Sequence, residues 1–97
     1  MYVIADISIV PMGVEASVSR YVKRAHQVLA DADLNATLCP YGTVVEGEYD
    51  LVTAAIKKAV EQVHAMGVPR ITMTIKMGSR TDKAQTAQDK LDAVNRP

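Results

Sequence analysis

Hydrophobic residues recur along the chain with two alternating periods, one typical of strands and one typical of helices. Residues 2–10 are rich in β-branched side chains and predict a strand. One face of this strand is mixed, and the other is fully apolar and carries Val3, Ala5, Ile7 and Ile9. From residue 18 to residue 32, apolar side chains follow the i, i+3, i+4 spacing of an amphipathic helix. Ser17 is the expected N-cap of that helix.

A β-hairpin and a second helix are predicted next. Residues 35–39 and 43–48 are predicted to be short strands separated by Pro40-Tyr41-Gly42. Proline fixes its own φ angle, and the glycine that follows can adopt φ angles that other residues avoid, as a tight turn requires. Asp50 can cap a helix whose apolar stripe extends to residue 66, and Gly67 stands where a left-handed residue ends a helix.

The last part of the chain completes a second strand–helix–strand unit. Residues 70–77 alternate strictly between apolar and polar side chains, which predicts a half-buried strand, and residues 82–94 form a short helix with a thin apolar edge. This order predicts one domain, 1–97, of the α+β class: a ferredoxin-like βαββαβ sandwich with a four-stranded antiparallel sheet and an additional C-terminal helix. Right-handed crossovers place both long helices on one face. The other face carries Tyr2, Ile4, Asp6, Ser8, Val10, Thr72, Thr74 and Lys76.

The composition limits what the core can contain. Hydrophobic residues make up 48% of the 97 residues and charged residues 23%, which is typical of a folded soluble domain. There are four Tyr but no Phe and no Trp, so the core must be built from aliphatic residues and Met. Large rings bury the most area per residue, and a domain of this size buries only about 60–65% of its unfolded surface. We therefore expect subunits to share apolar surface in a homo-oligomer.

Charges are balanced in total but not along the chain. The 11 basic and 11 acidic side chains give zero net charge, which argues against a nucleic-acid partner. Residues 1–50 nevertheless carry an acidic excess and residues 51–97 a basic one. The single cysteine, Cys39, can form no internal disulfide. The apolar N-terminal run is too short to span a bilayer and lacks a basic flank, so we expect a cytoplasmic protein without a membrane partner.

No residue pattern indicates catalysis. His26 and His64 have no ligating side chain at metal-binding spacing, and Cys39 is expected to be a small hydrophobe and not a nucleophile. There is no glycine-rich phosphate loop and no serine–histidine–aspartate arrangement. A hydrolase on this scaffold, as acylphosphatases are, would need an arginine in the loop after the first strand, and residues 11–14 contain none. We expect no enzyme activity, no metal and no cofactor.

The second strand of the hairpin carries the most informative residues. Glu46 lies in mid-strand, where a carboxylate is costly to bury unless a partner compensates its charge. Gly47 beside it allows another backbone or a ligand to approach closely. Glu46 is either a ligand-binding carboxylate or a charge that guards an edge strand against aggregation. At the first helix, Ser19 either lines the first turn or presents its hydroxyl to a ligand.

Several short motifs occur together in one order: Ser19-x-Tyr21, Pro40-x-Gly42-Thr43-x-x-Glu46-Gly47, Arg70 with Ile75-Lys76, and Arg80-x-Asp82. With these motifs, which span nearly the whole chain, the sequence resembles the thiamine-binding protein family. The resemblance implies a ferredoxin-like subunit, sheet-to-sheet or edge-paired dimers that assemble into a dimer of dimers, and no catalysis. It also implies binding of thiamine or its hydroxymethylpyrimidine part, in thiamine uptake, salvage or homeostasis.

The side chains in these motifs suit that ligand. A carboxylate such as Glu46 can accept from the aminopyrimidine, and hydroxyls such as those of Ser19 and Thr43 can donate or accept. A tyrosine can stack on a ring or face the thiazolium cation. The ligand-binding residues that the resemblance implies are Ser19, Tyr21, Tyr41, Gly42, Thr43, Glu46 and Gly47. The alternative is a structural or regulatory homo-oligomer that binds no small molecule and uses its polar sheet face only for subunit contact.

Overall fold

Two strand–helix–strand units and a short C-terminal helix make up the fold. The computed structural model describes residues 1–97 without a gap. In chain order the elements are β1 (Tyr2–Met12), α1 (Ser19–Asp31), β2 (Thr37–Cys39), β3 (Gly42–Glu48), α2 (Tyr49–His64), β4 (Arg70–Ser79) and α3 (Ala87–Asn95). The strands form one antiparallel sheet in the order β2-β3-β1-β4. The predicted α+β, ferredoxin-like arrangement with an additional helix is confirmed.

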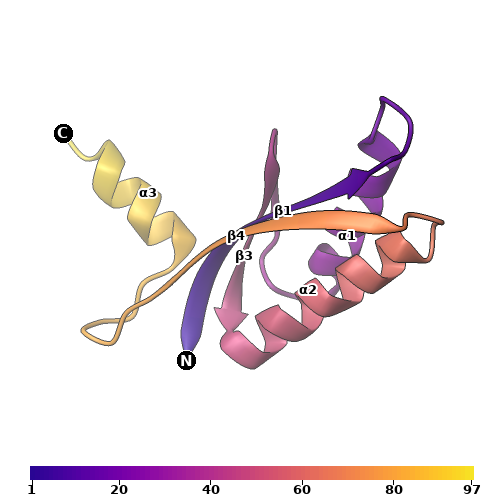
Figure 1. Ribbon diagram of the computed structural model, residues 1–97. Helices are drawn as coiled ribbons and strands as arrows, with labels where there is room; N and C mark the ends of the chain where they lie inside the picture. Colours follow the sequence, from indigo (N-terminus) through magenta and orange to yellow (C-terminus); the bar gives the residue numbers. More distant parts are fainter.

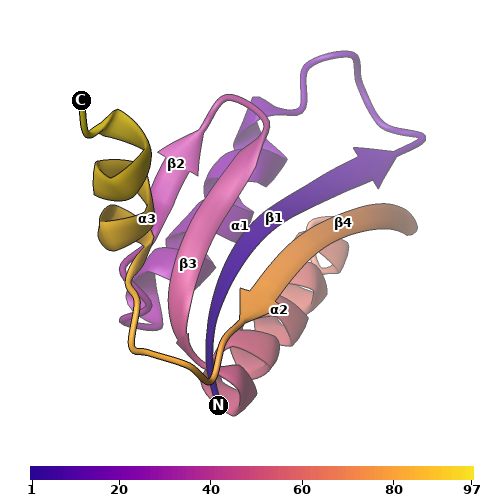
Figure 2. The same cartoon turned by 90° about the vertical axis from the view of Figure 1, so that its left-hand side faces the viewer.

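The helices divide the two faces of the sheet unequally. α1 and α2 cover one face, whereas α3 lies on the other side and stands away from the strands (Figure 1). Figure 2 looks onto that second face, with α1 and α2 behind the sheet. Residues paired across neighbouring strands point to the same face, so Asp6 lies beside Lys76 and Ser8 beside Thr74 on the uncovered side. We call this surface the open face, and its mixed character agrees with the sequence pattern.

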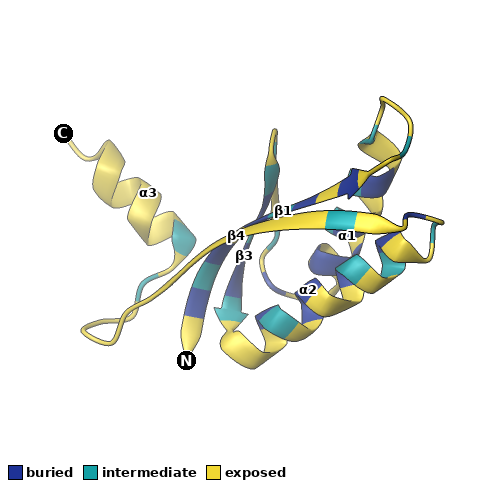
Figure 3. Cartoon of the chain, in the orientation of Figure 1, coloured by how far each residue is buried: buried dark blue, intermediate teal, exposed yellow.

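The core lies between the sheet and the pair α1 and α2. Its strand side is the apolar face of β1, where Val3, Ala5 and Ile7 are at most 2% exposed. Both helices contribute the apolar stripes that their spacing predicts, and Tyr21 is the only aromatic residue in the core. Figure 3 shows the buried segments concentrated between these layers, while α3 is almost entirely exposed. The core is therefore aliphatic, as the composition required.

Helices α1 and α2 begin differently from the predictions. The N-cap residue of α1 makes no side-chain capping bond, and Ser17 Oγ instead lies 3.3 Å from Ser19 Oγ. The prediction of Ser17 as N-cap is wrong. Asp50 is not a cap either, because α2 begins at Tyr49, two residues earlier than predicted, with Glu48 at the N-cap position. Asp50 instead places its negative charge in the first turn, where it interacts favourably with the positive end of the helix dipole. Gly67 does adopt the left-handed conformation expected after α2, with φ +92°.

Two further boundaries are set by local backbone chemistry. β2 is shorter than predicted because Asp33 and Asn35 adopt positive φ angles of 59° and 50°, which are incompatible with a strand. α3 begins at Ala87, later than the periodicity predicts, because Thr86 and Asp89 form a capping box. Thr86 Oγ1 accepts from the Asp89 backbone N–H at 3.0 Å, and Asp89 Oδ2 accepts from the Thr86 N–H at 3.0 Å.

β4 departs most from its predicted burial. Its alternation predicted a half-buried strand, yet Met73, Ile75 and Met77 are 47%, 42% and 36% exposed. These three side chains point to the same face as the buried residues of β1, since Ile75 pairs with Ile7 in the register. They are exposed because β4 is an edge strand and the two helices pack mainly over β1 and β3. The chain thus leaves the apolar row of β4 uncovered except at Ile71, which is partly buried against the core.

Gly42 supplies a test of how closely β3 approaches β1. A Cβ at this position would lie 2.7 Å from the Ile7 backbone oxygen, whereas a Cβ at Gly78 would meet nothing within 4 Å. We expect Gly42→Ala to lower the free energy of unfolding by about 1–3 kcal/mol, because the backbone must shift to admit the methyl group. Gly78→Ala, the matched control in a neighbouring strand, should leave stability unchanged or raise it by about 0.4–1 kcal/mol. Urea unfolding of both variants measures the difference, and equal stabilities would contradict the close approach.

Candidate functional site

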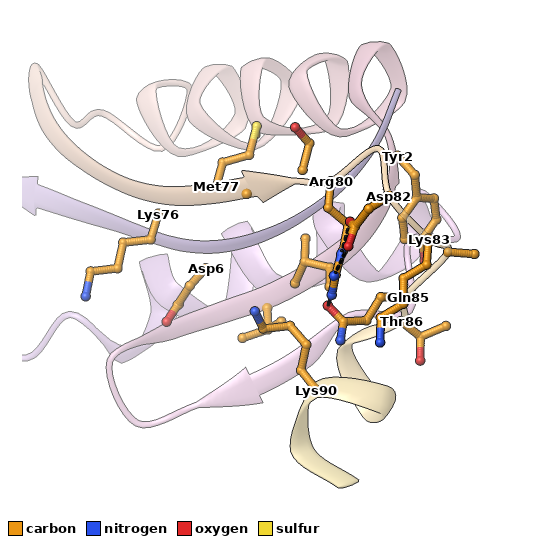
Figure 4. Close-up of a pocket in the computed structure, with 15 residues that line it drawn as sticks. Tyr2, Asp6, Lys76, Met77, Arg80, Asp82, Lys83, Gln85, Thr86 and Lys90 are labelled. Atoms are coloured by element: carbon orange, nitrogen blue, oxygen red, sulfur yellow. Dashed lines mark hydrogen bonds and ion pairs between the residues drawn. The ribbon is translucent and has the colours of Figure 1, made fainter. Parts of the chain in front are cut away.

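A large cavity lies on the open face, between the sheet and the residues that follow β4. Its volume is about 1110 Å³. The floor is formed by side chains of β1 and β3, namely Tyr2, Ile4, Asp6 and Val44. We call this the open-face cavity, and we call residues 80–95, which bend back over it, the C-terminal arm (Figure 4). The arm supplies the opposite wall of the cavity.

The strand register explains why the cavity exists. Ile4 pairs with Glu46 on one side and with Gly78 on the other, so all three lie on the open face. Gly78 has no side chain, and the space where its Cβ would stand is empty. Asp6 and Lys76 are direct cross-strand neighbours and bring one charge of each sign to the floor. The sheet therefore offers an apolar centre with charged groups beside it.

Glu46 joins the C-terminal arm to the sheet. Its carboxylate is only 7% exposed and accepts two hydrogen bonds, from Tyr2 Oη to Oε1 at 2.7 Å and from the Ala87 backbone N–H to Oε2 at 3.0 Å. Ala87 is the first residue of α3, so the carboxylate also faces the positive end of that helix dipole. The interpretation of Glu46 as an edge-strand guard is wrong, because β3 lies inside the sheet and the carboxylate is buried and paired.

Tyr2 is held in its protonated form by the same arrangement. Burial first, and then the hydrogen bond and the negative charge of Glu46, raise the pKa of Tyr2 from 10.0 to about 12. A phenol with this pKa is neutral at physiological pH and donates its proton to the carboxylate. The Tyr2 ring is nevertheless 42% exposed and lines the cavity. Tyr2 thus fixes Glu46 with its hydroxyl and leaves a ring surface for a ligand.

The C-terminal arm has its own local structure. Arg80 forms a bidentate ion pair with Asp82, with an Nε–Oδ1 distance of 2.6 Å, and donates from Nη1 to Gln85 Oε1 at 3.1 Å. The Arg80 guanidinium holds the pKa of Asp82 at about 2, well below its usual range. The arm is therefore braced by Arg80 at its start and by Glu46 at the first residue of α3.

A second, smaller pocket of about 240 Å³ lies on the helix side of the sheet, at the end of the β2–β3 hairpin. Val18 and Val22 of the α1 region line one side and Pro40 lines the other, so most of its surface is apolar. We call it the hairpin pocket. His26 Nδ1 lies 3.2 Å from the hydroxyl of Thr43, which lines the pocket.

The structure separates the seven residues that the resemblance implied. Tyr41, Gly42 and Thr43 line the hairpin pocket, with the Tyr41 ring 93% exposed. Ser19 lies at the exposed start of α1, on the same side of the sheet. Thr43 and Glu46 project from opposite faces of β3, so Glu46 belongs to the open face. The predicted set therefore does not form one site.

Two of the seven residues have structural roles in the fold. Tyr21 is 3% exposed, within the core, and its hydroxyl accepts from Arg20 Nη2 at 2.6 Å. Gly47 makes room for a side chain and not for a ligand, since a Cβ there would lie 2.8 Å from Leu34 Cδ2. The Leu34 carbonyl accepts from the Glu46 backbone N–H at 2.8 Å, which fixes the loop before β2 against β3. Both residues stabilise the region around the candidate sites.

Sequence reasoning missed several residues that line the open-face cavity. The sequence places Tyr2 and Lys76 on the mixed face of the sheet, and Lys76 also in one of the family motifs, but it assigns no role to Lys83 and Lys90. Their signal was weak, because they lie far apart in the sequence and converge only when β4 and the arm fold back over β1. The basic excess of the second half of the chain was the one available indication.

The structure contains no group of three or more His, Cys, Asp or Glu side chains placed to hold a metal ion. None of the three helices combines the length and the apolar run that crossing a bilayer requires. Cys39 is a free, partly buried thiol.

Fold and site together define a ferredoxin-like α+β domain with a solvent-open cavity lined by a tyrosine, a carboxylate and several basic side chains. The sequence profile of the family described as "Thiamine-binding protein" matches residues 5–95. The chain belongs to this family. The family description, together with the uncharacterised UPF0045 relatives, favours a binding protein over an enzyme.

Known relatives agree with this assignment. The UPF0045 protein of Synechocystis is 48% identical over 94 residues, which cover 97% of this chain and 78% of that protein. The crystal structure of a hypothetical protein from Methanocaldococcus jannaschii is 40% identical, with a TM-score of 0.89 over 96% of this chain and 95% of that one. A Thermotoga maritima protein described as a candidate thiamine biosynthesis or salvage protein has a TM-score of 0.84 over 98% of this chain and all of that one. Its 17% identity shows likeness of fold alone.

The Tyr2–Glu46 hydrogen bond can be tested by phenol titration. The wild-type protein should contain one tyrosine with a pKa of about 12, and Glu46→Gln should lower the pKa of that tyrosine toward 10.0 because the charge of Glu46 is removed. Since the folded-state pKa lies above the unfolded value, this contribution to stability is complete below about pH 10 and is lost as the pH rises to about 12. Phenolate absorbance measures the titration. Tyr2→Phe should abolish the high-pH step, and Tyr41→Phe should preserve it; the reverse result would contradict the assignment.

Proposed function

We propose that the protein binds thiamine, or the hydroxymethylpyrimidine part of thiamine, without catalysis and in the open-face cavity, as part of thiamine uptake, salvage or homeostasis. The observation that carries the proposal is the family match over residues 5–95. The described role of the Thermotoga maritima protein of the same fold points in the same direction.

The chemistry of the open-face cavity suits the two rings of thiamine. The exposed ring of Tyr2 can stack on the aminopyrimidine or face the thiazolium, and a cation–π contact contributes about 0.5–2 kcal/mol. Asp6 provides a carboxylate on the floor that can accept from the exocyclic amino group or attract the cationic ring. Glu46, already engaged by Tyr2 and Ala87, acts in this proposal by holding the ring and the arm in position.

Size and polarity favour the open-face cavity over the hairpin pocket. Ligand sites for small organic molecules usually enclose about 300–1,000 Å³. The open-face cavity reaches this size at about 1110 Å³, whereas the hairpin pocket, at about 240 Å³, holds at most one ring. The hairpin pocket also contains no acidic side chain for a cationic ligand.

A thiamine titration with paired variants tests the site. In isothermal calorimetry, Tyr2→Ala and Glu46→Gln should each weaken thiamine binding at least about tenfold, or about 1.4 kcal/mol, because each removes part of the ring platform or its support. Tyr41→Ala, at the exposed mouth of the hairpin pocket, should change affinity by less than about twofold. Loss of binding only in Tyr41→Ala would move the ligand to the hairpin pocket. No heat or thermal shift with thiamine or hydroxymethylpyrimidine would favour the alternative, a structural or regulatory oligomer.

The protein also forms a homo-oligomer in our proposal, with β4 as the first interface. β4 is a ten-residue edge strand whose outer backbone groups have no strand partner. An exposed edge of this length readily pairs with another strand. Met73, Ile75 and Met77 add an apolar row along the same edge.

Pairing of two β4 strands is self-complementary. A two-fold axis perpendicular to the sheet leaves its faces unchanged, so each apolar residue of one β4 must lie opposite an apolar residue of the other. The exposed rows formed by Met73, Ile75 and Met77 would then cover each other. On α3, Leu91 and Val94 form a second exposed apolar surface, at 57% and 82% exposure, on the other side of the sheet. Two separate surfaces are what a dimer of dimers requires.

Ile75→Lys tests the β4 interface. Light scattering after size exclusion should give an oligomer for the wild type and a smaller species for Ile75→Lys, because the lysine introduces like charges across the two-fold axis. Ile75 is exposed in the single chain, so its replacement leaves the subunit core intact. Leu51→Lys, at an exposed apolar residue of α2, is the matched control and should keep the wild-type mass. A wild-type monomer would contradict the interface.

A further inference from the structure

The open-face cavity carries an excess of positive charge that neither thiamine nor its pyrimidine part uses. Four basic side chains line it, namely Lys76, Arg80, Lys83 and Lys90, against the two carboxylates of Asp6 and Asp82. The chain as a whole has zero net charge, so this local excess is not a general property of the surface.

Pairing within the cavity leaves its net positive charge unchanged and places that charge on the lysines. Arg80 and Asp82 neutralise each other in their ion pair. Lys76, Lys83 and Lys90 form no ion pair within 4 Å. In Figure 4 Lys83 lies near Tyr2 and Asp82, whereas Lys76 and Lys90 lie on either side of Asp6. Lys76 and Lys90 are therefore the two unpaired ammonium groups at the open end of the floor.

These two lysines come from different walls of the cavity. Lys76 belongs to β4 and rises from the floor, whereas Lys90 belongs to α3 and reaches the cavity from the arm. In Figure 4 both side chains extend toward the side of the cavity that carries Asp6, away from the Arg80–Asp82 pair. The position of Lys90 relative to Lys76 depends on Glu46, because the Glu46 carboxylate anchors the first residue of α3.

We propose that the cavity binds a phosphate ester of thiamine, with Lys76 and Lys90 as the phosphate-binding residues. This inference rests on the proposed function and names the form of the ligand. A thiamine phosphate ester combines a cationic ring with an anionic group at the end of a short flexible chain. The cavity offers the complementary set: an aromatic ring at Tyr2, a carboxylate at Asp6 and two ammonium groups that can each donate charge-assisted hydrogen bonds to phosphate oxygens.

The size of the cavity agrees with this larger ligand. At about 1110 Å³ it exceeds the roughly 300–1,000 Å³ typical of small-molecule sites, and its lining includes the lysines as well as Tyr2 and Asp6. Since exposed charges are screened by salt, the preference for the ester should be strongest at low ionic strength.

Calorimetry with four ligands tests the inference on the full-length protein. At low ionic strength the wild type should bind thiamine monophosphate at least about tenfold more tightly than thiamine, because hydrogen bonds to charged groups are individually strong. The double variant Lys76→Gln/Lys90→Gln should lose this preference, because its affinity for the monophosphate should fall at least about tenfold while its affinity for the cationic thiamine should not fall. Inorganic phosphate and hydroxymethylpyrimidine are the other two ligands, and both should bind more weakly than the ester.

The matched control is Lys57→Gln/Lys58→Gln, which removes two exposed lysines of α2 on the opposite side of the sheet. It should keep the preference for the ester. Equal affinities for thiamine and its ester, or an equal loss in the control, would overturn this inference and leave the proposed function standing. Binding of inorganic phosphate as tight as that of the ester would also overturn it, by indicating a general anion site. Failure of both thiamine and the ester to bind would overturn the proposed function as well.

Discussion

The handedness of the two strand–helix–strand crossovers is the constraint on which the rest of this structure depends. Right-handed crossovers from β1 through α1 and from β3 through α2 place both helices on one face of the sheet. The apolar face of β1 is thereby buried, and the face carrying Asp6, Ser8 and Lys76 is left open. The core, the open-face cavity and the uncovered strand β4 all follow from this one-sided arrangement.

Glu46 ties the C-terminal arm to the open face and so completes one wall of the solvent-open cavity. A buried carboxylate needs compensating donors, and here the hydroxyl of Tyr2 and the first N–H of α3 supply them. The same two hydrogen bonds fix the aromatic floor and the arm that forms the opposite wall. Without this contact α3 would have little to hold it, because none of its residues is buried.

The absence of Phe and Trp has a consequence at the β4 edge of the sheet. An aliphatic core under two helices covers β1 and β3 but not β4, so apolar residues such as Ile75 remain exposed.

The basic excess of the second half of the chain becomes a local feature once the chain is folded. β4 and α3 both belong to that half, and their lysines converge on one cavity while the rest of the chain carries a small acidic excess.

The sequence by itself determined the order of elements, the buried face of β1 and both helix stripes, because periodicities of 2 and 3.6 directly report which side chains share a face. The separation of Thr43 from Glu46 was also implicit in that periodicity. The absence of a cap at Ser17, the exposure of Ile75 and the pairing of Tyr2 with Glu46 were decided only by the tertiary structure. These depend on contacts between residues distant in sequence or on backbone geometry at the ends of elements, and no local pattern records which distant group will supply the partner.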